Sequence, residues 1–420
     1  MYRITTLDNR LRVVTVPLAN ARSVSAGVYL AAGSRYEAER ESGAAHFIEH
    51  MLFKGTRRRT AKQIANAIES IGGYSNAGTG RETTTYYAMV TPEHLDLVLD
   101  LLSDMLLDST FQRKELERER GVIIEEINRT LDTPDDLVFE LATALEWPDN
   151  PVGRSIAGTH ETVSAMGRAA LLKFLQRHYL ANTAAVVVAG PVEHEEVVSR
   201  VARHFGAWQP GEPPSPEEPA PHPPESRIAA EVRGTEQAQM CLSLRGVARR
   251  DPDRFAVDIL SAILGDGMGS RLFQEIRERR GLAYSVDASA SHLQDTGAFT
   301  VYAGVPPEKA DEALAAIMEQ LDRIRRRLVT QAELERAKEY TKGHLLLGLE
   351  TPAANASWYG SQVVQGADIL TPEQWIAALD AVTADDVRRV ARKLFDGAAP
   401  QLALVGPFED TARFEPLLKL

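Results

Sequence analysis

The chain has 420 residues, of which 44% are apolar and 25% are charged, a composition typical of a globular protein. Lys and Arg number 47 against 59 Asp and Glu, and the formal net charge of -12 argues against a nucleic-acid-binding protein. These values also exclude a disordered chain, a collagen-like fibre and a coiled coil. The single cysteine, Cys241, excludes an intramolecular disulfide and a zinc site built from cysteines alone.

The N-terminal sequence predicts strands instead of a signal peptide, because apolar residues flank a turn at Asp8 and Asn9. The most hydrophobic helical stretch, residues 95–107, is interrupted by three aspartates. It is typical of a packed helix and not of a membrane span. We therefore expect no membrane segment, and a cytoplasmic location is the simplest expectation.

Apolar periodicity and turn residues predict strands and helices in mixed order along the chain. The expected strands are residues 24–30, 83–90, 184–189, 239–244, 299–305 and 401–405. The expected helices are residues 44–53, 61–71, 92–107, 114–131, 253–264, 270–279, 309–328 and 331–347. This mixture favours an α+β fold.

A proline-rich segment lies at the middle of the chain. Eight of the 22 prolines fall in residues 210–224, a run that favours an extended spacer. A helix, a strand and a Gly-Pro turn precede the spacer and recur 216 residues later, at the end of the chain. This repeat indicates internal duplication, with chance similarity of two αβ segments as the alternative. We expect two related halves, 1–209 and 226–420, joined by a linker at 210–225.

The strongest chemical feature is an H-x-x-E-H motif. His46 and His50 are four residues apart, which on a helix places both imidazoles on one face, near enough to share a metal ion. Glu49 can approach the open coordination position of that metal without being a ligand. The motif is a zinc-peptidase signature, in which the carboxylate takes a proton from zinc-bound water. The alternative is a surface helix that carries two histidines and a glutamate.

A catalytic zinc site needs a third protein ligand, for which residues 117–127 are the candidate region. Glu119 and Glu126 are seven residues apart, about two helical turns, so they share a face. Val122 and Ile123 lie between them and allow this face to point inward. A solvated charged helix is the alternative, and the spacing alone does not decide between the two.

Gly33–Glu37 (GSRYE) and Gly43–Thr56 (GAAHFIEHMLFKGT) closely resemble the pitrilysin/insulinase-type metallopeptidases, above all the mitochondrial processing peptidase-like branch of short subunits. Residues 119–126 (ERGVIIEE) match the E-R-x-V-I-x-x-E pattern that ends in this family's third metal ligand. The resemblance implies that His46, His50 and Glu126 bind one Zn²⁺ per chain. It further implies that Glu49 is the general base and that Glu119 supports the site without binding the metal.

The segment 75–87 resembles the family's edge strand. The resemblance implies that its Asn-Ala pair, here Asn76 and Ala77, binds the backbone of an extended substrate by β-augmentation. An ordinary strand rich in Thr and Tyr is the alternative, and it is our expectation for Tyr86 and Tyr87.

Residues 270–285 (SRLFQEIRERRGLAYS) resemble the family's Arg/Tyr motif, in which Arg277 and Tyr284 are seven residues apart. The resemblance implies that both side chains reach the substrate near the zinc, where they would stabilise the developing oxyanion. The alternative is a basic helix end followed by a strand tyrosine.

For the whole chain, the resemblance implies a clam-shell of two duplicated αβ halves with mixed or antiparallel sheets. The first half is expected to be catalytic, and the second, which has no H-x-x-E-H, to be inactive. The expected function is that of a zinc endopeptidase that hydrolyses unfolded peptides in an enclosed chamber. Because both motif sets lie on one chain, we expect a self-sufficient homodimer. The alternatives are a non-catalytic subunit or scaffold protein and a zinc hydrolase acting on something other than peptides.

Overall fold

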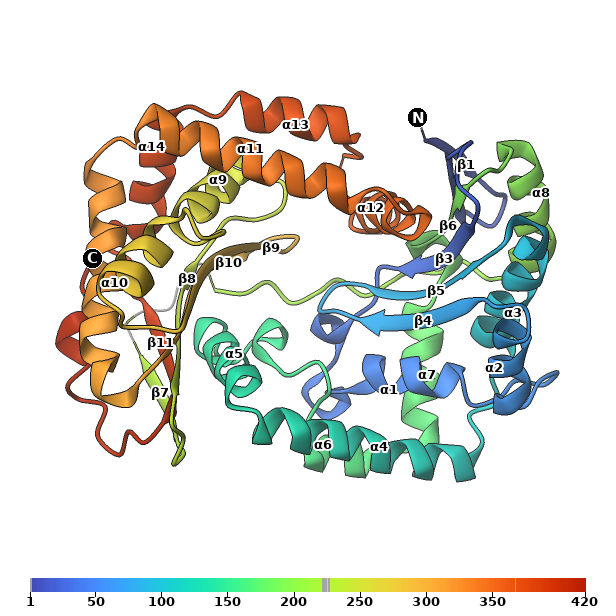
Figure 1. The fold of residues 1–420 in the computed structure, drawn as a ribbon. Coiled ribbons are helices and arrows are strands. Elements are labelled where there is room, and N and C mark those ends of the chain that lie inside the picture. The colour runs from blue at the N-terminus through green and yellow to red at the C-terminus, as the bar shows by residue number, and fades with distance from the viewer. Residues whose placement is uncertain (1, 221–224, 226, 367) are drawn as a thin grey trace. The chain divides into compact units, whose positions relative to one another are not determined.

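The computed structural model describes residues 2–220, 225, 227–366 and 368–420. They form two compact units, each with its own β-sheet and flanking helices (Figure 1). The first unit consists of residues 1–127, 155–217 and 346–371, and the second consists of 128–154, 218–345 and 372–420. Residues 210–220 contain no helix or strand, and residues 221–224 of the expected linker lie outside the described residues.

The first unit contains a six-stranded sheet with the strand order β1-β2-β6-β3-β5-β4. Its strands are β1 (Arg3–Thr6), β2 (Arg12–Pro17), β3 (Val24–Leu30), β4 (Tyr74–Thr79), β5 (Thr84–Val90) and β6 (Ala184–Gly190). The second unit contains a five-stranded sheet with the order β7-β11-β8-β10-β9. Its strands are β7 (Ile228–Val232), β8 (Ala238–Arg245), β9 (Ser285–His292), β10 (Gly297–Val305) and β11 (Gln401–Gly406).

The two sheets share one topology. Within each half, the strands can be numbered one to five in sequence order, starting at β2 in the first sheet and at β7 in the second. The order across both sheets is then first, fifth, second, fourth and third. In both, the first and fifth strands pair in parallel, as β2 with β6 and β7 with β11, and the remaining pairs are antiparallel. The α+β class with two similar halves is therefore confirmed, and β4 and β9 are the corresponding edge strands.

The helices of the first unit are α1 (Ala44–Leu52), α2 (Ala61–Glu69), α3 (Leu95–Asp108), α6 (His160–Ala165), α7 (Arg168–His178), α8 (His194–Phe205) and α12 (Pro352–Val364). Helix α4 (Arg113–Asp132) begins in this unit and ends in the second. The second unit contains α5 (Pro134–Glu146), α9 (Arg254–Leu264), α10 (Ala310–Arg326), α13 (Pro372–Asp380) and α14 (Ala384–Phe395). Helix α11 (Gln331–Gly348) lies almost wholly in the second unit. None of the helices that the structure describes is long and apolar enough to cross a membrane.

Both faces of each sheet are covered, so that alternate residues of one strand enter different cores. In β6, Val186 and Val188 pack with α1, α3 and α7, whereas Val187 packs with α12 on the other face. In the second unit, α5 covers one face of β8 and β11, and α9, α10 and α14 contribute to the core on the other. The units therefore differ from the sequence halves at two segments, since α5 packs with the second sheet and α12 with the first.

The second unit contains a buried ion pair between Glu146, the last residue of α5, and Arg245 of β8, with 3.1 Å between Oε1 and Nε. Burial outweighs the attraction to Arg245 and raises the pKa of Glu146 from 4.5 to about 7. The Glu146 carboxyl therefore binds its proton more tightly in the folded protein than in the unfolded chain. The resulting stabilisation is complete below pH 4.5 and is lost as the pH rises toward 7.

We expect Glu146→Gln to remove this pH dependence. The free energy of unfolding of the wild type, minus that of the variant, should fall by about 3 kcal/mol between acidic and neutral pH. Urea unfolding of both proteins across this range measures the difference. If the two curves run parallel with pH, Glu146 does not titrate in this range.

Candidate metal centre

Helix α1 carries both histidines of the H-x-x-E-H motif on one face, and their rings lie 4.7 Å apart between centroids. The helix begins after Gly43, whose φ of 93° favours glycine. A Cβ at Gly43 would also lie 2.6 Å from the carbonyl oxygen of Ala157. The start of α1 therefore depends on a residue without a side chain.

A carboxylate from outside the helix caps the same end of α1. Glu37 is buried, and its two oxygens accept hydrogen bonds from the backbone N–H groups of Gly43 at 2.9 Å and Ala45 at 2.8 Å. An anion at a helix N-terminus satisfies free N–H groups and interacts favourably with the helix dipole. Glu37 thus fixes the end of the helix that holds the histidines.

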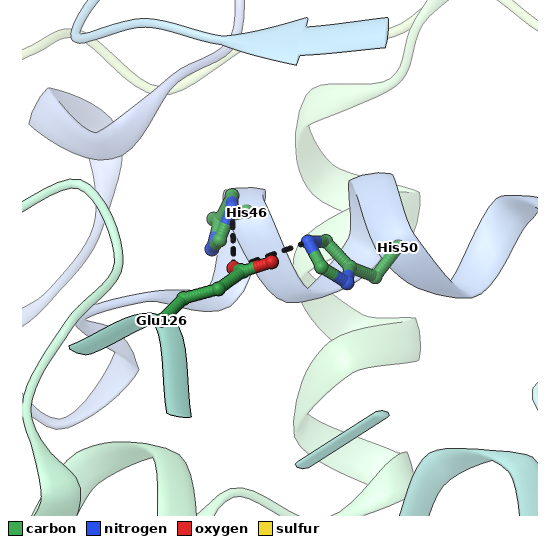
Figure 2. A group of neighbouring side chains, drawn as sticks. All are labelled: His46, His50 and Glu126. Carbon is green, nitrogen blue, oxygen red and sulfur yellow. Dashed lines mark ion pairs between the residues drawn. The ribbon is translucent and has the colours of Figure 1, made fainter. Parts of the chain in front are cut away.

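The third residue, Glu126, comes from α4. Its Oε2 atom lies 3.6 Å from Nε2 of His46 and 3.5 Å from Nε2 of His50 (Figure 2). Each of the three residues offers one possible ligand atom, and these three atoms all lie within 4.8 Å of one another. The structure therefore brings together the three residues expected to bind metal.

The donor set and its spacing fit a zinc ion. Two imidazole nitrogens and one carboxylate oxygen make a usual catalytic zinc site, with bonds of about 2.0–2.2 Å. In a tetrahedral site such bonds place neighbouring ligand atoms about 3.4 Å apart, close to the two separations from Glu126. Burial, reinforced by repulsion from His50, lowers the pKa of His46 to about 4. His46 is therefore neutral near pH 7 and has a free lone pair, as a metal ligand requires.

Glu119 lies behind His50. It is only 3% exposed, and its Oε2 atom lies 3.3 Å from Nδ1 of His50, on the side of the ring away from Glu126. Its other oxygen forms an ion pair with Nζ of Lys54 at 2.9 Å. A carboxylate in this position selects the tautomer of a histidine ligand and fixes the plane of its ring. The helix carrying the E-R-x-V-I-x-x-E pattern thus turns both Glu119 and Glu126 toward α1.

Glu49 is held by the end of β4. Its Oε2 atom accepts a hydrogen bond of 2.6 Å from Oγ1 of Thr79. Burial raises the pKa of Glu49, and hydrogen bonding to Thr79 opposes that rise. Partial desolvation makes a carboxylate more basic, as general-base catalysis requires.

Asn76 and Ala77 lie on β4, which pairs with β5 on one side and forms the edge of its sheet on the other. The Asn76 side chain is exposed, and its Oδ1 atom accepts a hydrogen bond from the Ala77 N–H at 2.9 Å. Tyr86 of β5 is buried and bonds Tyr179 through its hydroxyl, whereas Tyr87 is half-buried.

A pocket of about 540 Å³ opens beside Glu49 and His50. The start of β4, from Tyr74 to Asn76, forms part of its wall. The apolar part of its lining is Phe53, Ala61, Ile64, Ala65 and Ile68. An apolar side chain of an extended peptide could occupy such a space beside the three clustered residues.

Arg277 and Tyr284 lie in the second unit and contact each other. The Arg277 guanidinium stacks over the rings of Phe273, at 4.8 Å, and Tyr284, at 5.2 Å. Arg277 lies on a π-helix, Phe273–Arg279, where the sequence predicts an ordinary helix. Tyr284 is 70% exposed. Stacking on two aromatic rings holds the guanidinium while leaving the phenol accessible.

Three residues around the site were not assigned a role from the sequence: Glu37, Lys54 and Thr79. Glu37 and Lys54 fall within the segments that carry the family resemblance, but that resemblance names no function for them. Thr79 lies two residues beyond Ala77, on the same face of β4 because side chains alternate along a strand. That alternation was the one available signal for Thr79.

Two family models and several curated relatives match the chain. The family model described as Insulinase (Peptidase family M16) matches residues 12–160, and the model described as Peptidase M16 inactive domain matches residues 165–340. An uncharacterized zinc protease of Streptomyces coelicolor is 39% identical over 414 residues, which cover 97% of this chain and 90% of the relative. The uncharacterized zinc protease YmxG of Bacillus subtilis is 35% identical over 408 residues, which cover 97% of this chain and 98% of the relative.

Two solved structures have a similar fold. A protease from Helicobacter pylori matches with a TM-score of 0.90 and 25% identity, covering 97% of this chain and 99% of the other. A peptidase M16 inactive domain from Pseudomonas fluorescens matches with the same TM-score and 20% identity, covering 97% and 98%. At that identity, the second match concerns the fold alone.

Proposed function

The chain belongs to the insulinase family of peptidases (family M16), and we propose that it is a zinc-dependent endopeptidase that hydrolyses unfolded peptides. The observation that carries this proposal is the convergence of His46, His50 and Glu126 within 4.8 Å. Glu49 precedes His50 on the same helix and supplies a second carboxylate beside this group. Two imidazoles, a carboxylate ligand and a separate base are the parts that metal-assisted hydrolysis needs.

In this proposal, Nε2 of each histidine and the carboxylate of Glu126 hold the zinc. A bound zinc ion supplies a Lewis acid that polarises the peptide carbonyl and makes water more acidic. Glu119 keeps the His50 ring oriented through Nδ1, and Lys54 holds Glu119 in turn. His50 is thus oriented by Glu119, and both histidines lie on a helix whose N-terminal end is fixed by Glu37.

Glu49 is the proposed general base. It takes a proton from the attacking water and then delivers it to the leaving amine, so that one carboxylate serves both halves of the reaction. Its partly desolvated setting supports this role, because burial raises its pKa. The hydrogen bond from Thr79 engages Oε2 and leaves Oε1 for the transferred proton.

The free edge of β4 supports an extended peptide as the substrate. An extended peptide is proposed to add to this edge at Asn76 and Ala77, where the Ala77 N–H would exchange its bond to Asn76 Oδ1 for one to the substrate backbone. The adjacent pocket could take a substrate side chain. By family resemblance, Arg277 and Tyr284 are proposed to stabilise the negative charge that develops on the carbonyl oxygen.

Metal removal tests the proposal. We expect the purified chain to bind about one zinc and to cleave a quenched, unstructured peptide. Chelation should abolish the cleavage, and added Zn²⁺ should restore it. Light scattering on the same preparation tests the homodimer that the sequence leads us to expect.

A non-catalytic subunit is the second candidate, since the family model matching residues 165–340 is described as an inactive domain. A zinc-loaded chain that cleaves none of a varied set of unstructured peptides would favour that candidate. Cleavage that persists after zinc has been removed would contradict the zinc-dependent mechanism.

A further inference from the structure

Thr79 joins two parts of the site that are far apart in sequence. It is the last residue of β4, and Glu49 lies 30 residues earlier, on α1. The Thr79 hydroxyl donates a hydrogen bond of 2.6 Å to Oε2 of Glu49. A short hydrogen bond from a hydroxyl to a carboxylate is a strong one and restricts rotation of the carboxylate.

The strand places Thr79 on the face of β4 that packs against α1. Ser75, Ala77 and Thr79 alternate with the exposed Tyr74, Asn76 and Gly78. Thr79 stands opposite Thr84 of β5, and the neighbouring hairpin is closed by a hydrogen bond of 2.7 Å from Gly80 to Thr83. The position of the Thr79 hydroxyl is therefore fixed by the register of the hairpin.

We propose that Thr79 is a positioning residue that ties the Glu49 carboxylate to the peptide-binding edge strand. This inference rests on the proposed function, in which β4 binds the substrate peptide and Glu49 acts as the general base. Substrate and base are then held by the same strand, so the register of the bound peptide also sets the distance from its reacting bond to Glu49. Orientation of this kind affects the chemical step more than it affects binding.

Kinetics of three variants test the inference. Thr79→Val keeps the shape of the side chain and removes the hydroxyl, and we expect kcat to fall about ten- to a hundredfold while KM changes less than about threefold. Thr79→Ser restores the hydroxyl and should recover kcat to within about threefold of the wild type. Thr85→Val, on the neighbouring strand opposite Gly78, is the matched control and should leave both constants near the wild-type values. Equal losses in Thr79→Val and Thr79→Ser, or a change in KM alone, would overturn the proposal.

A second measurement does not depend on activity. In the metal-free protein, we would compare the urea midpoints of the wild type, Thr79→Val, Glu49→Ala and the double variant. If the bond exists, Thr79→Val shifts the midpoint less in the Glu49→Ala background than in the wild type. Additive shifts would show that the two residues are not coupled and would overturn the inference. If the wild type binds zinc but cleaves no peptide, the proposed function fails instead, and this cycle still reports on the bond.

Discussion

Replacing Glu49 with glutamine is expected to lower kcat about a hundred- to ten-thousandfold while one zinc remains bound per chain. Glutamine keeps the size of the side chain and can still accept the hydrogen bond from Thr79, but it cannot take up a proton at neutral pH. Glu49 is not one of the three clustered residues, so metal binding should persist. The zinc content and the cleavage rate of a quenched peptide, measured on one preparation, separate these two effects.

Glu69 provides the matched control for this experiment. It lines the same pocket as Glu49 and is exposed, yet it does not belong to the group of possible metal ligands among the described residues. Glu69→Gln removes one negative charge from that pocket and should leave kcat within about threefold of the wild type, because an effect on the binding of a substrate side chain there would change KM instead. Full activity in Glu49→Gln with zinc still bound would show that another group acts as the base.

Local sequence signals predicted much of the scaffold. The apolar run from Val24 to Leu30 coincides with β3, because a short apolar run can be buried on both faces of a sheet. The predicted helix at 44–53 differs from α1 by one residue. For His46 and His50, the four-residue spacing was sufficient to predict that both imidazoles lie on one face of a helix. These predictions depend on neighbours in sequence, where periodicity is informative.

Periodicity could not predict that α5, from the first half of the sequence, packs on the second sheet, or that α12, from the second half, packs on the first sheet. An amphipathic pattern shows that a helix buries one face, but not which sheet covers it. In α12 the contact depends on Gly360, where a Cβ would lie 2.6 Å from the ring of Tyr29 on β3. A glycine 331 residues from its partner gives no local sign of that contact.

The candidate site shows the same limit. Glu119 and Glu126 were selected from a charged helix by family resemblance, because a seven-residue spacing fits a solvated face equally well. Thr79 reaches Glu49 only through the register of β4 against β5. Contacts set by strand register or by helix packing bring distant residues together, so they appear only once the chain has folded.

Separate replacement of Glu119 and Glu126 should affect zinc binding to different extents. Glu126→Gln removes a negatively charged ligand, and we expect zinc affinity to fall more than about a hundredfold and peptide cleavage to be lost. Glu119→Gln leaves all three ligands in place but weakens the orientation of His50 and the pairing with Lys54. The expected loss of affinity is about ten- to a hundredfold, the range typical of residues that orient a ligand.

Both variants can be compared with Glu117→Gln on the same helix, whose carboxylate is exposed and pairs with Arg120 at 3.1 Å. This control changes the net charge equally but faces away from the site, so zinc affinity should stay within about twofold of the wild type. Competition with a chromogenic chelator measures all four proteins on one scale. The order of zinc affinities distinguishes the two roles, because losing a ligand should lower the affinity more than losing a residue that orients a ligand. If Glu119→Gln loses as much affinity as Glu126→Gln, then Glu119 itself binds the metal; if neither loses affinity, the zinc lies elsewhere.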